Sequence, residues 1–257
     1  MRRGPSGGYD FGNKRQYRRN IWRTFRDACK GRLSTAEALL MPSAEGDEIE
    51  AALNAGFREQ NLHVVDDNPA IVAHLKRRYS RIMTYGIPVA EAARRIAKSG
   101  SRLAVANLDL CHNLSAPLRR TLFQFGAAEP MEQHGLIAVT MLRGREQGDC
   151  AEAMRTISTR AGSNDISRAW LAAIQLGSLG QDTARMWTPT FIRDGIYKSI
   201  SGNQTMFWFV VRMCSKEWPS NFKSLQIESE TIGAIPHTDH DQLAHLWLPC
   251  SECCSNG

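Results

Sequence analysis

The alternation of apolar and polar segments between residues 36 and 142 constrains the fold of this chain more than any other feature. Short apolar runs, each the length of a buried strand, are separated by segments in which apolar residues recur every three or four positions. We expect strands at residues 38–41, 62–65, 82–85, 103–110 and 136–142, with helices between them. Such an alternation predicts an α/β domain with a mostly parallel sheet and helices on both faces.

A second pattern near residue 200 extends this sheet. Apolar runs at residues 196–200 and 205–213 flank Gly202-Asn203, and a pair of this kind between two strands is typical of a β-hairpin. Two segments before it, at about 150–160 and 164–178, have helical spacing. We therefore expect a C-terminal antiparallel hairpin at the edge of the parallel sheet.

Two of the expected helices begin with capping signals. Asp47 is placed to cap a helix over residues 47–55, because Glu50 follows three positions later as in a capping box. Gly56 is placed to end that helix. Asn68-Pro69 opens the next helix, with proline at the first helical position.

The positive charge of the chain is concentrated at its N-terminus. The 257 residues carry a net charge of +6, but residues 1–32 hold ten Lys and Arg against two Asp (+8), so the remainder carries −2. Within this arm, residues 17–29 place Ile21 and Phe25 on one side of a helix, with arginines around them. This helix could pack on the body or lie against a phosphate backbone. A basic arm attracts polyanions, nucleic acid first among them, although a solvated tail fits the same composition.

Ligands of an open α/β sheet bind beyond the carboxyl ends of its strands, so the loops after the strands form the candidate site. The first loop contains Ser43, Glu45 and Gly46, and the second strand ends at Asp66 and Asp67. Asp66 lies 20 residues beyond Gly46, the spacing expected of an acidic residue that accepts hydrogen bonds from both ribose hydroxyls. An N-cap of the following helix is the alternative role for Asp66 and Asp67.

Polar residues also follow the fourth and fifth strands. Asn107 and Asp109 occupy alternate positions of one strand, so their side chains share a face, where burial is costly unless they are paired or functional. Asp109, at the open end, is a candidate for polarising an acceptor; a hydrogen bond to a neighbouring loop is its alternative role. Arg143 and Arg145 flank a glycine and could hold a phosphate or carboxylate. A surface turn with an ion pair to Glu146 is the alternative there.

Residues 38–114 resemble the class I S-adenosylmethionine-dependent methyltransferases, which have a Rossmann-like fold. The resemblance rests on the EIE helix after the first turn, VDDNP after the second strand, Tyr85-Gly86 after the third and NLDL at the fourth. The hairpin also matches that fold and is unlike a dinucleotide-binding dehydrogenase. The first loop departs from the family, whose glycine-rich loop lets the backbone approach the cofactor, because Gly46 is its one glycine.

The resemblance implies S-adenosylmethionine as the cofactor and a role for each loop. The first loop approaches the methionine part, the acid after the second strand holds the ribose, and the third loop flanks the adenine. The cofactor-binding candidates are Ser43, Glu45, Gly46, Asp66, Asp67, Tyr85, Gly86 and Asn107. Asp109 is the catalytic candidate near the methyl group and acceptor, and Arg143 and Arg145 are the substrate-binding candidates. The segment lacks the Asn/Asp-Pro-Pro-aromatic tetrad of amino-methylating DNA enzymes.

The C-terminal segment contains metal-ligand residue types. Cys250 and Cys253 have the CxxC spacing of a zinc knuckle, after His237, His240 and His245. A single such pair at the end of the chain is more typical of a frayed tail, so we predict no metal site. Seven cysteines, three of them in the last eight residues, do not fit a secreted disulfide framework.

We expect three regions: a basic arm and helix (1–35), a methyltransferase-like domain (36–215) and a C-terminal extension (216–257). No apolar run approaches the roughly 20 residues of a membrane span, and the basic N-terminus lacks the apolar segment of a secretory signal, so we expect a cytoplasmic protein. The leading hypothesis is methyl transfer to a nucleic-acid or other polyanionic acceptor. A non-catalytic methyltransferase-like module that binds nucleic acid or protein is the alternative, and a different nucleotide ligand is a third. The loop at 42–48 discriminates between the first two.

Overall fold

A computed structural model describes residues 12–144, 146, 148, 150–155, 164–177, 185–198 and 204–217. Within them the strands are β1 (Glu37–Leu40), β2 (Leu62–Val65), β3 (Met83–Tyr85), β4 (Leu103–Asp109), β5 (Met131–Leu142), β6 (Arg185–Lys198) and β7 (Thr205–Glu217). The helices are α1 (Gly12–Ala28), α2 (Asp47–Ala55), α3 (Pro69–Arg78), α4 (Val89–Lys98), α5 (Ala116–Ala127) and α7 (Asn164–Leu176), with a 3-10 turn at Glu59–Asn61 and further helical residues at 150–155.

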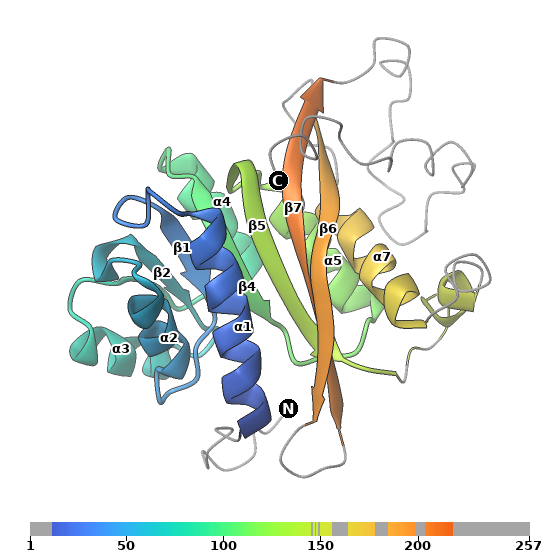
Figure 1. Cartoon of the computed structure of the whole chain (residues 1–257), viewed down its shortest axis with the longest axis horizontal. Coiled ribbons are helices and arrows are strands. Elements are labelled where there is room, and N and C mark those ends of the chain that lie inside the picture. The colour runs from blue at the N-terminus through green and yellow to red at the C-terminus, as the bar shows by residue number, and fades with distance from the viewer. Residues whose placement is uncertain are drawn as a thin grey trace.

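All seven strands belong to one sheet with the order β3-β2-β1-β4-β5-β7-β6 (Figure 1). Neighbouring strands from β3 to β5 are parallel, whereas β7 runs antiparallel to both β5 and β6. The chain crosses from β3 at one edge to β4 beside β1, so the strand order reverses between β1 and β4. The predicted fold class, a mostly parallel sheet with a C-terminal antiparallel hairpin, is confirmed.

Helices cover both faces of the sheet and form two apolar cores. The core on one face combines α1, α2 and α3 with the sheet, and the core on the other face combines α4, α5 and α7 with it. Alternation along β7 shows why both faces are apolar, because side chains of a strand point to opposite faces in turn. Trp208 and Val210 join the α1 side, while Phe207 and Phe209 join the α5 side.

The N-terminal helix α1 packs on the body of the protein. Tyr17, Ile21, Trp22 and Phe25 are all at most 2% exposed, and they lie against the sheet and α2. This spacing of four, one and three residues places them on one side of a helix. The sequence left open whether this helix packs on the body or lies against a phosphate backbone. In the structure, the apolar side of α1 packs on the body. No helix in the described part of the chain is long and apolar enough to span a membrane.

The start of α2 differs from the expectation. The N-cap is Gly46, with φ +76° and no side-chain cap, and Asp47 is the first helical residue. Asp47 instead pairs with Arg18 of α1 at 3.1 Å, so a contact between helices replaces the expected cap. Gly56 ends α2 as predicted, with φ +104°.

The terminal hairpin is longer than its apolar pattern suggested. β6 begins at Arg185 rather than at residue 196, and it pairs with β7 along its whole length. It is an edge strand, so it tolerates Pro189 and the exposed side chains that conceal its pattern. β5 likewise begins at Met131, before the expected residue 136, and its register with β4 shifts near Val105.

Candidate functional site

The carboxyl ends of the parallel strands define the candidate site, and they fall into two parts. We call Asp66, Asp67, Tyr85 and Gly86 the β2–β3 end, and Asn107, Asp109 and Thr140 the β4–β5 end. The loop after β1, residues 41–46, lies between them in strand order. Helix α1 begins at this edge of the sheet, because Lys14 in its first turn reaches Asp109 at the end of β4 (Figure 1).

At the β2–β3 end, Asp66 is held in a fixed position. Its carboxylate accepts the N–H of Asn68 at 2.7 Å, and its own N–H donates to the carbonyl oxygen of Tyr85 at 3.2 Å. Asp66 is only 7% exposed, whereas Asp67 is exposed. The N-cap of α3 is Asn68, whose side chain accepts the N–H of Ala70. Neither aspartate is therefore that cap.

The side chain of Tyr85 is held by a hydrogen bond to a buried histidine. Its hydroxyl lies 3.0 Å from Nδ1 of His63, and Nε2 of His63 lies 3.0 Å from Glu37. Burial lowers the pKa of His63, while the hydrogen bond and charge of Glu37 oppose that shift. A neutral ring that donates from Nε2 to Glu37 and accepts the Tyr85 hydroxyl at Nδ1 satisfies all three groups. Gly86 packs against Pro69: a Cβ on Gly86 would lie 3.4 Å from the Cα of Pro69.

The loop after β1 is shaped by its own neighbours. A Cβ on Gly46 would approach the ring of Tyr79 to 3.1 Å, and its φ lies in the left-handed region, so both features require glycine. The Glu45 carbonyl accepts Arg78 at 2.7 Å. A hydrogen bond from Ser43 lowers the pKa of the exposed Glu45 carboxyl group. Ser43 and Glu45 thus present polar atoms at the edge, while Gly46 turns the chain into α2.

At the β4–β5 end, Asp109 forms an ion pair with α1. Its Oδ2 lies 3.0 Å from Nζ of Lys14, and its Oδ1 accepts the thiol of Cys111 at 3.0 Å. Both charged side chains are largely buried, 16% exposed for Lys14 and 8% for Asp109. Burial by itself would lower the pKa of Lys14, but the attraction of Asp109 and Cys111 raises it above its usual value.

Asn107 lies on the same face and meets the next turn of α1. The Tyr17 hydroxyl donates to its Oδ1 at 3.0 Å and also hydrogen-bonds with the Thr140 hydroxyl at 2.5 Å. Burial, and then the charge of Asp109, raise the pKa of Tyr17 well above its usual range. Nδ2 of Asn107 is buried and has no hydrogen-bond partner among the described residues. Asn107 and Asp109 share a face, as predicted.

Sequence reasoning missed a second buried network beside this one. Glu48 is 2% exposed and accepts Nε1 of Trp22 at 2.6 Å and Nε of Arg18 at 3.2 Å. Burial raises the pKa of Glu48, and Arg18 and Trp22 oppose that rise. Glu48 lies in the first turn of α2, and no role for it was predicted from the sequence. The bond to α1 has no local signal in the sequence.

The arginines predicted to hold an anion are placed differently from each other. Arg143 forms a bidentate pair with Asp165 of α7, at 3.0 and 2.9 Å, and is half exposed. Arg145 lies outside the described residues. Glu146 pairs with Arg168, at 2.5 Å. Arg143 borders a hollow of about 360 Å³ between α1 and the hairpin, lined also by Tyr17, Tyr197, Thr205 and Trp208.

Within the described part of the chain, no group of three or more metal-ligand residues is clustered. The C-terminal Cys and His run, including Cys250 and Cys253, lies outside that part. The described residues therefore do not test the zinc-knuckle alternative.

The strand order, the antiparallel β7 and the helices on both faces define the class I methyltransferase fold. Among solved structures, the chain is similar to a Streptococcus mutans protein provisionally assigned as a SAM-dependent methyltransferase, with 13% identity and a TM-score of 0.50 over 79% of this chain. It spans 50% of that protein's length.

Two further structures show weaker likeness. N-methyltransferase NodS from Bradyrhizobium japonicum, solved with S-adenosyl-L-homocysteine, aligns at 11% identity and a TM-score of 0.47, over 79% of this chain and 88% of NodS. TrmN from Thermus thermophilus aligns at 12% identity and 0.44, over 78% and 52%. The sequence matches no protein-family profile and no curated protein sequence. The likeness to the Streptococcus mutans protein bears on the fold, and a fold alone does not establish a function.

The sequence resemblance predicts S-adenosylmethionine as the cofactor, and the residues of this edge can be compared with its nucleoside part. Asp66 is a buried, oriented carboxylate at the end of β2, the position that suits a ribose. The orphaned Nδ2 of Asn107 is a buried donor that lacks an acceptor among the described residues. The loop after β1 fits less closely, because Pro42 and Glu45 stand where the family has glycines. There the side chains of Ser43 and Glu45, rather than bare backbone, would meet the methionine part.

Proposed function

We propose that this protein transfers a methyl group from S-adenosylmethionine to a nucleic acid. The observation that carries the proposal is the arrangement at the carboxyl edge of a class I methyltransferase sheet, where Asp66 follows β2, and Asn107 and Asp109 lie at the end of β4, on the other side of β1. The cofactor supplies an electrophilic methyl group on a sulfonium. The protein's contribution is binding, alignment and charge placement.

Each residue has a distinct task in this proposal. Asp66 accepts hydrogen bonds from the ribose hydroxyls, with the exposed Asp67 beside it, and Tyr85 and Gly86 border the adenine. Asp109 accepts a hydrogen bond or a proton from the acceptor. Lys14 fixes the orientation of the Asp109 carboxylate and compensates its charge.

A nucleic-acid acceptor is favoured by the charge of the segment at this edge. Helix α1 carries six Lys and Arg against one Asp, and its first turn contacts Asp109. Polyanions concentrate around such a segment. Arg143, at the end of β5, is the candidate for an additional phosphate contact once it exchanges Asp165 for the acceptor. Arg145 shares that assignment.

The test is methyl transfer from methyl-labelled S-adenosylmethionine to single-stranded RNA, single-stranded DNA, duplex DNA and an acidic polypeptide. We expect label in a nucleic acid, and a loss of turnover of about 10²-fold or more in Asp109→Asn, with cofactor affinity little changed. Asp194→Asn, at an exposed position on β6, is the matched control. Transfer to none of the acceptors would contradict the proposal.

A non-catalytic module that binds nucleic acid is the second candidate. The observation that favours it is the combination of a glycine-poor first loop with an Asp109 already paired to Lys14. The two candidates differ in a single result. The module binds nucleic acid but takes up no S-adenosylmethionine, whereas the enzyme binds both.

A further inference from the structure

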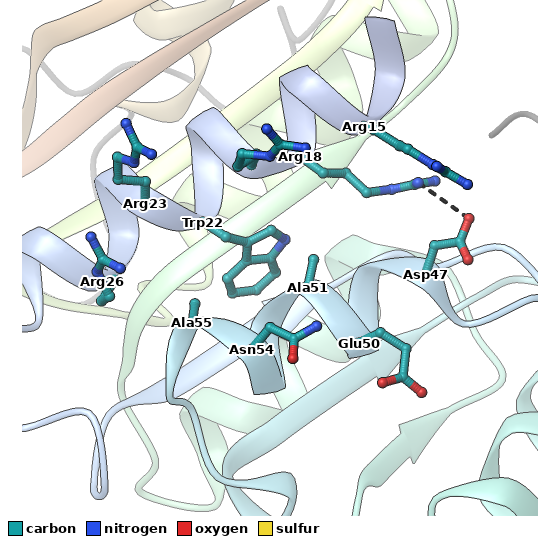
Figure 2. A pocket seen from close by; sticks show the side chains of 11 residues that line it. Arg15, Arg18, Trp22, Arg23, Arg26, Asp47, Glu50, Ala51, Asn54 and Ala55 are labelled. Carbon is teal, nitrogen blue, oxygen red and sulfur yellow. Dashed lines mark ion pairs between the residues drawn. The ribbon is translucent and has the colours of Figure 1, made fainter. Parts of the chain in front are cut away.

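A groove runs between α1 and α2 on the face of the sheet that these helices cover (Figure 2). Its volume is about 390 Å³. Trp22, with Ala51 and Ala55 of α2, forms its floor, and arginines of α1 stand along one wall. Because the side chains of Ala51 and Ala55 are small, the space between α2 and α1 stays open.

The arginines on α1 form a straight stripe. Arg15, Arg19, Arg23 and Arg26 are separated by four, four and three residues, which places them on one side of the helix. All four are exposed. Successive members stand roughly 4.5–6 Å apart along the axis, given a rise of about 1.5 Å per residue. The stripe therefore offers regularly spaced positive charges along the whole groove.

Other cations of α1 serve the fold instead. Lys14 pairs with Asp109, and Arg18 pairs with Asp47 and Glu48; both side chains are largely buried. By contrast, Arg19 and Arg23 have no ion pair to any carboxylate within the described ranges, and Arg26 pairs only locally with the exposed Asp27. The charge of α1 is thus divided between a structural set and a solvent-facing set.

The opposite wall of the groove does not neutralise this solvent-facing set. Its two carboxylates, Asp47 and Glu50, lie at the end near Arg15 (Figure 2). Asp47 is engaged by Arg18, and Glu50 accepts both Arg78, at 3.0 Å, and the Tyr79 hydroxyl, at 2.5 Å. Beyond them, α2 lines the groove with uncharged residues alone, namely Asn54 and the two alanines of the floor, Ala51 and Ala55. The middle and far parts of the groove therefore attract anions.

We propose that this groove binds the phosphodiester backbone of a single nucleic-acid strand. Guanidinium groups bind phosphate oxygens in a bidentate manner, and a single row of arginines along one wall of the groove matches a single phosphodiester chain. The indole of Trp22 is 2% exposed, so it offers no surface for base stacking, and binding is independent of base sequence. The proposal rests on the nucleic-acid acceptor proposed above and gives its path: the strand follows α1 from Arg26 toward Arg15 and so reaches the edge where Lys14 meets Asp109.

The test is fluorescence anisotropy of a labelled oligothymidylate and a mixed-sequence strand of equal length, titrated with the full chain at several salt concentrations and without cofactor. The test variant is Arg19→Gln/Arg23→Gln, which removes two groove charges and keeps good helix formers. Arg77→Gln/Arg94→Gln is the matched control, because both arginines are exposed, on α3 and α4, outside the groove. Thermal unfolding confirms that both variants remain folded.

We expect the groove variant to bind about tenfold more weakly at low salt, and its slope of log K against log salt to be shallower by about 1.4, or 0.7 for each lost contact. The control variant should match the wild type, and both strands should bind equally. An unchanged slope in the groove variant, an equal loss in the control, tighter binding of a duplex, or equal displacement by polyglutamate would overturn the proposal. Methyl transfer is not read in this assay, so intact groove binding without methylation would refute only the proposed enzymatic function.

Discussion

The two ends of the carboxyl edge are built in different ways. At the β2–β3 end, Asp66 is oriented by Asn68, two residues further along the chain, and Tyr85 by His63 of the neighbouring strand β2. At the β4–β5 end, Asn107 and Asp109 are held by α1, through Tyr17 and Lys14, from the other end of the sequence. The proposed cofactor side is therefore formed by β2, β3 and the start of α3, while the proposed acceptor side depends on how α1 packs on the sheet.

This difference assigns two functions to one helix. Its apolar side belongs to the core, and its first turns complete the polar cluster at the β4–β5 end. Its exposed side keeps the arginines of the groove in solvent. A change in α1 should therefore alter the β4–β5 end and leave the β2–β3 end intact.

The largest expected effect is the loss of stability when α1 loses its anchor. Trp22→Ala removes a side chain that is 2% exposed and leaves Glu48 without its indole donor, so we expect a loss of about 3–5 kcal/mol in the free energy of unfolding. Urea unfolding measures it, with the exposed Arg23→Ala as a control, expected within about 0.5 kcal/mol of the wild type. A loss for Trp22→Ala similar to that of the control would mean that α1 is not part of the core.

A smaller effect is expected from the ion pair that joins α1 to the β4–β5 end. Lys14→Met leaves the largely buried Asp109 carboxylate without its cation, which should cost about 1–3 kcal/mol. A double-mutant cycle with Asp109→Asn isolates the coupling between the two side chains, expected at about 0.5–3 kcal/mol. Additive single-variant effects would show that Lys14 and Asp109 do not interact in solution, and the contrast between the two ends would lose its main support.

The smallest effect concerns the β2–β3 end and depends on pH. Because burial lowers the pKa of His63 in the folded protein, the unfolded chain binds the proton more readily. Stability from the neutral ring is therefore complete above the usual histidine pKa of about 6.5 and declines as the pH falls below it, by at most about 1.4 kcal/mol per pH unit. His63→Gln should flatten the dependence of melting temperature on pH between 7.5 and 5.5, and the exposed His74→Gln should not. Equal flattening by both variants would assign the dependence to exposed histidines.

The sequence predicted those parts of the fold that depend on local periodicity. Apolar runs located β1 to β4 within one or two residues, and Gly202-Asn203 located the hairpin. The length of β6 was missed because an edge strand tolerates polar residues that remove the alternation. The N-cap at Gly46 was missed because Asp47 forms an ion pair with Arg18 of α1 instead of capping α2. A contact between two helices cannot be predicted from the residues next to Asp47 in the sequence.

The candidate site was predictable only in part for the same reason. The position of Asp66 follows from strand ends and spacing, which a sequence displays. The partners of Asp109 and Asn107 come from about ninety residues away, at Lys14 and Tyr17, so their contacts appear only when α1 packs on the sheet. The one available signal was the burial expected for Asn107 within a strand, which requires a partner but does not name it.

The central claim is that the β2–β3 end holds the nucleoside part of S-adenosylmethionine, and calorimetric titration of the full chain with this cofactor tests it most directly. The account predicts binding at one site per chain, weakened by about 1.5–3 kcal/mol in Asp66→Ala, because a buried carboxylate loses its hydrogen bonds to the ribose. The neighbouring Asp67→Ala should have a smaller effect, since Asp67 is exposed and Asp66 is not. No binding to the wild type, or the same affinity in Asp66→Ala, would contradict the account.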